Sequence, residues 1–123
     1  MLKIDIHGNE MELTDAIVAA IETKLGALDK YLTHIGEPKT LRVEVGKTTH
    51  HHNKGQLFRA EANLSLPGRL IRAENTSYEL YGAIDLVKDE LKREILKMIS
   101  AKTDARRDGA RAAKEEGTET ELV

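Results

Sequence analysis

The feature that most constrains the fold is the stretch YELYGAIDLVKDELKREILKM, which runs from Tyr78 to Met98. Its large apolar residues recur every three or four positions, which is the spacing of an α-helix with one apolar stripe. The stripe comprises Leu80, Ile84, Val87, Leu91, Ile95 and Met98. A helix of this kind is stable only when another layer of the protein buries the stripe. The chain is therefore expected to supply a hydrophobic surface for a helix of about 21 residues, roughly 32 Å long.

The rest of the chain predicts a sheet and a second helix. Thr14 is suited to cap a helix, and apolar residues repeat at helical spacing from Ile17 to Leu32. Pro67 and Gly68 predict a tight turn, because proline fixes φ and glycine supplies a positive φ. Apolar and polar residues alternate, as in strands buried on one face, in three segments: about 2–7, 41–45 and 58–66. A fourth strand is expected after the turn, over about residues 69–74. The predicted fold is α+β, with the order β-α-β-β-β-α and two helices packed on one face of a four-stranded sheet.

Composition limits the protein class. A chain of 123 residues suits one compact domain, and with 3% aromatic residues its core is expected to be aliphatic. The net charge of −2 gives no global attraction to nucleic acid, so any such binding needs a local basic patch. The absence of cysteine excludes disulfides and thiolate metal sites. No apolar run is long enough for a signal peptide or a membrane span, so we expect a soluble cytoplasmic protein.

The last 23 residues differ from the rest of the chain. Residues 101–114 carry five basic and two acidic side chains, whereas residues 115–123 carry four acids and no base. With few large apolar residues, such a segment cannot bury enough surface to offset its ordering entropy. We therefore predict a folded domain over residues 1–100 and a flexible charged tail over 101–123, with helical structure in its first part.

The polar side of the predicted long helix allows two interpretations. Its basic residues each follow an acid by three positions, which stabilises a helix in water. They are Lys88, Lys92, Arg93 and Lys97. A mixed charge run is usually a solvated face. A phosphate-binding face is normally less neutralised, although the basic series continues with Lys102, Arg106, Arg107 and Arg111, where acids are fewer. The residues alone leave both interpretations open.

Other candidate sites have weaker support. His50, His51 and His52 fall in the loop between the second and third strand segments, and no third or fourth ligand is apparent, so we expect no metal site. Tyr78 and Tyr81 can stack on bases, but half-buried packing at the start of the helix is the favoured interpretation. No nucleophile motif, phosphate loop or zinc motif occurs. We therefore expect no enzyme, no catalytic residue, no cofactor and no small-molecule substrate.

Four segments share a pattern with a known family: IDIHGNEMELTDAI, KLGALDKYLTHI, LPGRLIRAE and YELYGAIDLVKDELKREI. They resemble the bacterial ribosome hibernation factor family, also called ribosome-associated inhibitor or sigma-modulation proteins. The last segment is the most specific, because it matches the family's acidic-Leu/Met-Tyr-x-Ala-Ile-Asp pattern, with Glu79 where an Asp is usual. The resemblance covers about residues 1–100 and, more loosely, the start of the tail.

The resemblance implies a fold similar to double-stranded RNA-binding domains and a function on the ribosome. Family members bind the small ribosomal subunit at the decoding region, where mRNA and tRNA would sit, and hold ribosomes inactive in stress. The family's basic residues against ribosomal RNA correspond by position to Lys24, Lys30, Lys88, Lys92, Arg93 and Lys97. The tail sequence DARRDGARAA adds Arg106 and Arg107, whereas Ala27 stands where the family often has Lys.

The family also has long members, whose separate C-terminal domain pairs two ribosomes. This chain ends before such a domain, so the resemblance implies a short form, which we expect to be monomeric away from the ribosome. Whether it promotes or prevents ribosome pairing stays open. The alternative from another class is a protein–protein regulator that acts on the transcription machinery through the charged helix.

Overall fold

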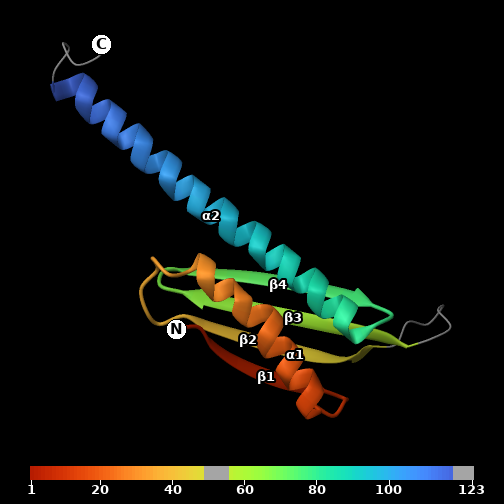
Figure 1. Cartoon of the computed structure of the whole chain (residues 1–123). Helices are drawn as coiled ribbons and strands as arrows, with labels where there is room; N and C mark the ends of the chain where they lie inside the picture. The colour runs from red at the N-terminus through yellow and green to blue at the C-terminus, as the bar shows by residue number, and fades with distance from the viewer. Residues whose placement is uncertain (49–55, 118–123) are drawn as a thin grey trace.

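The predicted order of elements is confirmed in a computed structural model of the chain, which describes residues 1–48 and 56–117, with side chains through residue 103 (Figure 1). The elements are β1 (Lys3–Asn9), α1 (Asp15–Gly26), the 3-10 helix η1 (Ala27–Tyr31), β2 (Thr40–Thr48), β3 (Leu57–Leu66), β4 (Arg69–Ser77) and α2 (Leu80–Gly117). The strands agree with the predicted segments to within a few residues at each end. The first helix differs from its prediction, because the α-helical part ends at Gly26 and a 3-10 turn follows.

The four strands form one mixed sheet in the order β1-β2-β3-β4. β1 pairs with β2 in parallel, and the remaining neighbours are antiparallel. A parallel pair needs a long crossover connection, which α1 supplies. β3 and β4 are joined by the predicted tight turn, where Gly68 has a φ of 74°. Thr14 caps α1 as predicted, since its side-chain oxygen accepts a hydrogen bond from the Ile17 amide at 3.2 Å.

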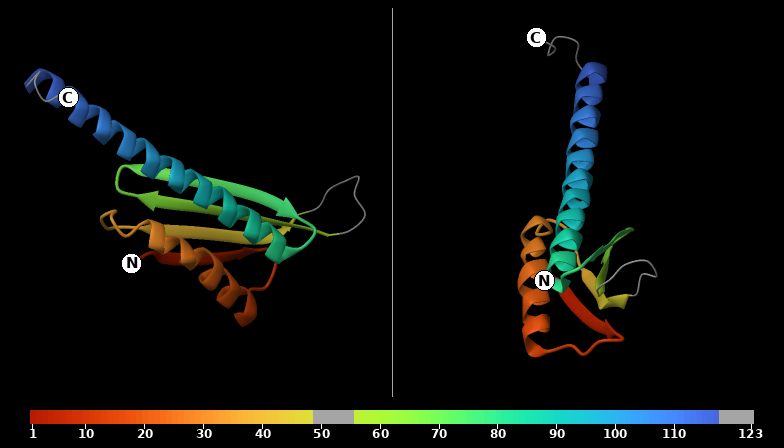
Figure 2. Two further views of the ribbon diagram at one scale, coloured as in Figure 1. Left: turned by 45° about the horizontal axis from the view of Figure 1, so that its top comes forward. Right: turned by 90° about the vertical axis from the view of Figure 1, so that its right-hand side faces the viewer.

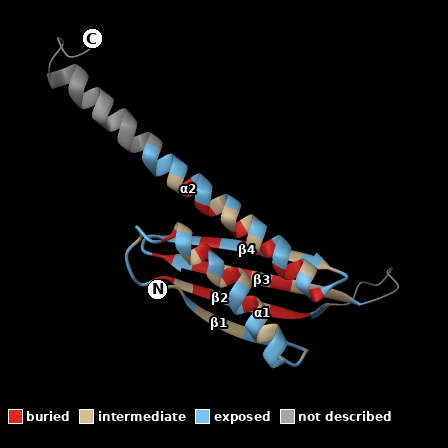
Figure 3. Ribbon diagram, viewed as in Figure 1, coloured by how far each residue is buried: buried red, intermediate tan, exposed pale blue. Residues whose placement is uncertain are grey.

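Both helices cover the same face of the sheet (Figure 2). Alternate strand residues on that face are buried, and the apolar stripe of α2 lies against them (Figure 3). All six predicted stripe residues are at most 9% exposed. Under α2 the strands contribute small side chains, among them Ala62 and Ala73, which allow the helix to lie close to the sheet. The core is aliphatic, as the composition predicts.

Helix α2 is longer than predicted. It contains 38 residues, which corresponds to about 57 Å, and it continues beyond the sheet (Figure 1). The segment after Ser100 is rich in alanine, the residue with the highest helix propensity, which explains why the helix does not end with its buried stripe. The division into a folded domain and a flexible tail stays a prediction. Among the helices within residues 1–48 and 56–117, none combines the length and hydropathy needed to cross a bilayer.

Candidate nucleic-acid interface

Tyr31 brings two of the predicted basic residues together. The Lys30 ammonium lies 5.2 Å from the centroid of the Tyr31 ring, and the Lys92 ammonium lies 5.6 Å from it. Both distances fit cation–π contacts. The pKa of the Tyr31 phenol lies below its ordinary value, because hydrogen bonding to Lys92 and the charge of Lys30 favour the phenolate, while burial acts in the opposite direction. The contacts link η1 to α2 and concentrate positive charge between them.

The segment that carries Lys30 and Tyr31 is held at both ends. Leu28 and Leu32 are buried in the core on either side of the two residues. The buried ammonium of Lys39 donates a hydrogen bond to the Leu32 carbonyl oxygen at 3.0 Å, where η1 ends. Because Lys39 is only 6% exposed, this bond satisfies a group that would be costly to leave unpaired. Lys30 and Tyr31 are thus presented by a fixed turn.

A second contact joins the helices further along. The Lys24 ammonium of α1 lies 2.6 Å from a carboxylate oxygen of Asp85 on α2. Lys88 follows Asp85 by three positions and precedes Lys92 by four, so it faces the same side of α2 as both. We call Lys24, Lys30, Lys88 and Lys92 the interhelical lysine cluster. The structure therefore brings together four of the eight residues that the sequence predicted for RNA binding.

The other predicted residues lie apart from this cluster. Arg93 is exposed on the solvent side of α2, and Lys97 pairs with Glu94 at 3.5 Å. Nearby, Glu90 accepts a hydrogen bond from Asn75 of β4 at 2.8 Å, which places this flank of α2 over β4. The remaining two residues, Arg106 and Arg107, lie on the α2 backbone, but their side chains fall outside the described residues, as do His50, His51 and His52.

The acids on α2 neutralise the cluster less than the sequence spacing implied. Of the four predicted pairs at three-residue spacing, the structure shows only that between Glu94 and Lys97. Asp85 pairs with Lys24 instead of Lys88. Of the predicted RNA-binding residues whose side chains the structure describes, four have no carboxylate oxygen within 4.0 Å: Lys30, Lys88, Lys92 and Arg93. These cations are available to an external anion.

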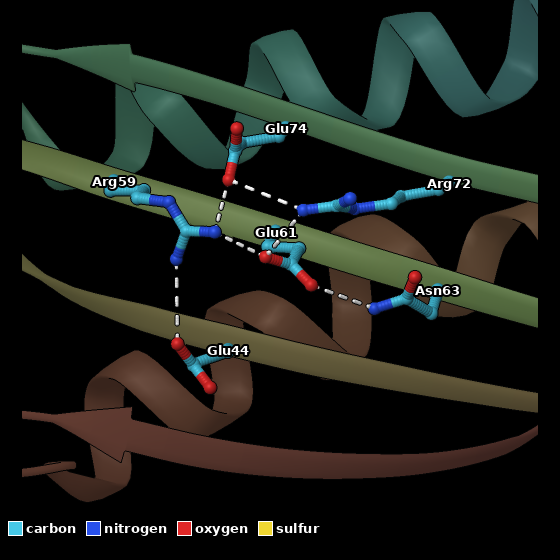
Figure 4. Close-up of polar contacts among 6 residues, drawn as sticks. All are labelled: Glu44, Arg59, Glu61, Asn63, Arg72 and Glu74. Carbon is cyan, nitrogen blue, oxygen red and sulfur yellow. Dashed lines mark hydrogen bonds and ion pairs between the residues drawn. The ribbon is translucent and has the colours of Figure 1, made fainter.

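The opposite face of the sheet is charged but internally paired (Figure 4). Glu44, Glu61 and Glu74 are direct neighbours across β2, β3 and β4. The Arg59 guanidinium contacts all three carboxylates, and Arg72 contacts the latter two at 3.2 and 3.6 Å. Without these arginines, like charges placed directly opposite one another would destabilise the sheet. A surface with three aligned carboxylates is a poor partner for phosphates, so the helical side is the candidate interface.

The same network sets the protonation of its central carboxyl group. The pKa of Glu61 lies below its ordinary value, because the Asn63 side chain donates a hydrogen bond to it at 2.9 Å. Burial opposes this effect, and the positive charges of Arg59 and Arg72 add to it. The carboxylate is therefore kept ionised and paired, which is typical of a structural ion network rather than of an acid–base catalyst.

Sequence reasoning missed Tyr31. It considered only Tyr78 and Tyr81, which are 59% and 43% exposed and do not belong to the core cluster. The signal for Tyr31 was its position inside the segment KLGALDKYLTHI, between a predicted RNA-binding lysine and the end of the first helix. Its contact with Lys92 depends on tertiary packing, because the two residues are 61 positions apart.

The family of the chain follows from a comparison with known families. The family model described as "Sigma 54 modulation protein / S30EA ribosomal protein" matches residues 4–102. The chain belongs to this family. The resemblance inferred from the four sequence segments is thereby confirmed, and the match spans all the residues of the interhelical lysine cluster.

Two curated members of the family are similar to most of this chain. The ribosome hibernation promotion factor of Lactococcus lactis subsp. cremoris (strain MG1363) is 38% identical over 99 residues, which cover 79% of this chain and 49% of that protein. The protein of the same name from Staphylococcus aureus (strain COL) is 31% identical over 97 residues, covering 79% and 48%. The chain thus spans about half the length of the curated relatives that it matches.

Two solved structures share the fold. The crystal structure of the Thermus thermophilus Protein Y N-terminal domain aligns with a TM-score of 0.57 and 32% identity, covering 76% of this chain and 93% of that one. A ribosomal subunit interface protein from Coxiella burnetii aligns with a TM-score of 0.65 and 23% identity, covering 81% and 99%. At that identity the second structure supports the fold alone. The similarity to double-stranded RNA-binding domains stays a prediction.

Proposed function

We propose that the chain is a ribosome-binding hibernation factor of the cytoplasm, which occupies the mRNA and tRNA decoding region of the small subunit and inhibits translation under stress. The observation that carries the proposal is the interhelical lysine cluster, in which Lys30, Lys88 and Lys92 have no carboxylate partner and lie on the side of the molecule opposite the paired carboxylates (Figure 4). The family membership and the names of the relatives support the choice of the ribosome as the partner.

The proposed mode of binding is contact with RNA phosphates rather than base reading in a duplex. Folded RNA is recognised mainly by its shape and by phosphate and ribose contacts. Lys30, Lys88 and Lys92 would make the central contacts, and Tyr31 would keep two of them at a fixed spacing. The basic residues outside the cluster would contact RNA beyond it: Arg93, Lys97, Arg106 and Arg107. The protein would act by occupying space as a monomer, without catalysis.

Sedimentation of the purified chain with small ribosomal subunits tests this proposal. Each phosphate contact contributes about 0.7–0.9 to the salt dependence of binding, so the three central contacts alone predict a slope of log K against log salt of about −2 to −3, and contacts beyond the cluster would make it steeper. An affinity that stays the same between low and moderate salt would remove the phosphate mechanism. A protein that stays in the unbound fraction at low salt would instead favour the alternative of a protein–protein regulator of transcription.

A further inference from the structure

A cleft beside α2 is lined by residues at and just after the end of η1 and by the β3–β4 turn. It consists of two cavities, of about 230 and 290 Å³, which share Ile35, Met98 and Lys102 in their walls. The smaller cavity is also lined by Tyr31 and His34, and the larger one by Arg69. Because Tyr31 belongs to this cleft and also contacts the interhelical lysine cluster, the two sites are continuous.

The cleft combines an apolar interior with a positive rim. Ile35, Met98 and Ile99 supply aliphatic surface, and Met98 is almost completely buried, so this part of the wall is fixed. Lys102 and Arg69 are exposed at the rim. Among the described residues that line either cavity, none is acidic, although the chain contains 21 acids. The site is therefore suited to a ligand that is apolar and flat at one end and anionic at the other.

We propose that this cleft binds one unpaired nucleobase of an RNA strand, with Lys102 and Arg69 holding the phosphates on either side of the base. Unpaired bases stack on aromatic and apolar side chains, whereas bases inside a duplex are not accessible in this way. Each cavity is slightly smaller than the range of about 300–1,000 Å³ that holds drug-sized ligands, which suits a single ring system. An apolar side chain of a protein would fill the same space but would leave the positive rim without a counter-charge.

This inference rests on the proposed function and makes it more specific. The interhelical lysine cluster would bind phosphates of any sequence, and the cleft would add a requirement for an unstacked nucleotide next to them. The chain would then select a junction between paired and unpaired RNA. Phosphate contacts alone would not distinguish such a junction from a continuous duplex.

The first test uses nuclear magnetic resonance of the methyl-labelled full chain. Hexaadenylate is compared with an abasic oligomer that carries the same phosphates. A base in the cleft places its ring against Ile35, Met98 and Ile99, so their methyl signals should show ring-current shifts with hexaadenylate and none with the abasic oligomer. The methyl signals of Ile17, on the distant part of α1, should not change with either.

A matched pair of variants locates the effect. Thr103→Leu narrows the cleft, because Thr103 lines it, whereas Ser100→Leu adds the same side chain to an exposed position of α2 outside both cavities. Stacking of one base accounts for at least about fivefold in affinity, so Thr103→Leu should weaken hexaadenylate binding about fivefold or more and Ser100→Leu less than about twofold. Binding of the abasic oligomer should be the same in both variants.

Two results would overturn the inference while leaving the proposed function intact. One is unchanged cleft methyl signals in a protein that still sediments with small subunits. The other is a photo-cross-linker at position 103 that, in the subunit complex, joins a ribosomal protein and not RNA. Failure to sediment with subunits, together with base-dependent methyl shifts, would instead contradict the proposed function and retain a single-stranded RNA site.

Discussion

Reversing two charges on α2 distinguishes the contribution of the interhelical lysine cluster to ribosome binding from that of the other basic residues of the helix. The perturbation is Lys88→Glu with Lys92→Glu, and the matched control is Arg93→Glu with Lys97→Glu. Both double variants change the net charge of the same helix by the same amount. They differ in position, because Lys92 lies 5.6 Å from the Tyr31 ring whereas Lys97 pairs with Glu94 on the other flank.

The expected magnitudes follow from these contacts. Losing two phosphate contacts should lower the salt slope by about 1.4–1.8. Each exposed ion pair with a phosphate contributes about 0.2–1 kcal/mol to binding, and reversing the charge costs roughly twice that amount because repulsion replaces attraction. For two lysines, binding should therefore weaken by about 1–4 kcal/mol, or roughly five- to several-hundred-fold. The lost cation–π contact at Tyr31 should destabilise the fold by only about 0.5–1 kcal/mol, which lowers the melting temperature by about 2–8 °C.

The assay is sedimentation with small subunits at two salt concentrations, with circular dichroism melting of each free variant. The cluster variant should fold and lose most of its affinity, while the control variant should lose much less. Equal losses in the two variants would refute the assignment of the interface to the interhelical lysine cluster. They would favour a diffuse attraction to the whole helix.

Three further predictions concern the fold. Leu91→Ala should destabilise the protein by about 2–5 kcal/mol in denaturant unfolding, because Leu91 is fully buried; a loss below about 1 kcal/mol would contradict its place in the core. Arg59→Ala should cost about 1–2 kcal/mol, since it leaves Glu44 without its cation and leaves Arg72 alone to neutralise Glu61 and Glu74. Arg42→Ala, at an exposed position of β2, should lower the free energy of unfolding much less than Arg59→Ala. Equal losses in the two variants would show that the ion pairs of Arg59 add nothing to stability. The pKa of Glu61 is lowered in the folded state, so its contribution to stability is present above about pH 4.3 and is lost as the pH falls through the folded pKa. Between pH 7 and pH 3 the melting temperature of Glu61→Gln should therefore fall less steeply than that of the unmodified protein. Equal falls in the two proteins would refute the contribution of ionised Glu61 to stability.

The sequence predicts those parts of the fold that rest on local periodicity. The stripe of α2, the alternation in the strands and the turn at Gly68 are fixed by rules that act over a few residues. Each of them is confirmed in the structure. The end of α1 at Gly26 was not predicted, because the apolar spacing continues through Leu28 and Leu32, which are both buried, even though the backbone tightens into a 3-10 turn.

The candidate site was predicted in part. Position in the family pattern selected the four lysines of the cluster, but it could not separate them from Arg93 and Lys97. That separation depends on which flank of α2 faces η1. In the same way, spacing assigned Asp85 to Lys88, whereas packing of the two helices brings Asp85 to Lys24. Contacts between residues distant in sequence decide which charges are neutralised.

The chemical reactivity of each lysine in the complex with small ribosomal subunits tests directly whether the interhelical lysine cluster faces the RNA. Acetylation of free and bound protein, read by mass spectrometry, reports which ammonium groups the RNA covers. We expect strong protection of Lys30, Lys88 and Lys92, with little change at Lys3, which is exposed on β1. Protection of Lys3 with a cluster that stays reactive would contradict the proposed interface, because the sheet side and not the helical side would then face the ribosome.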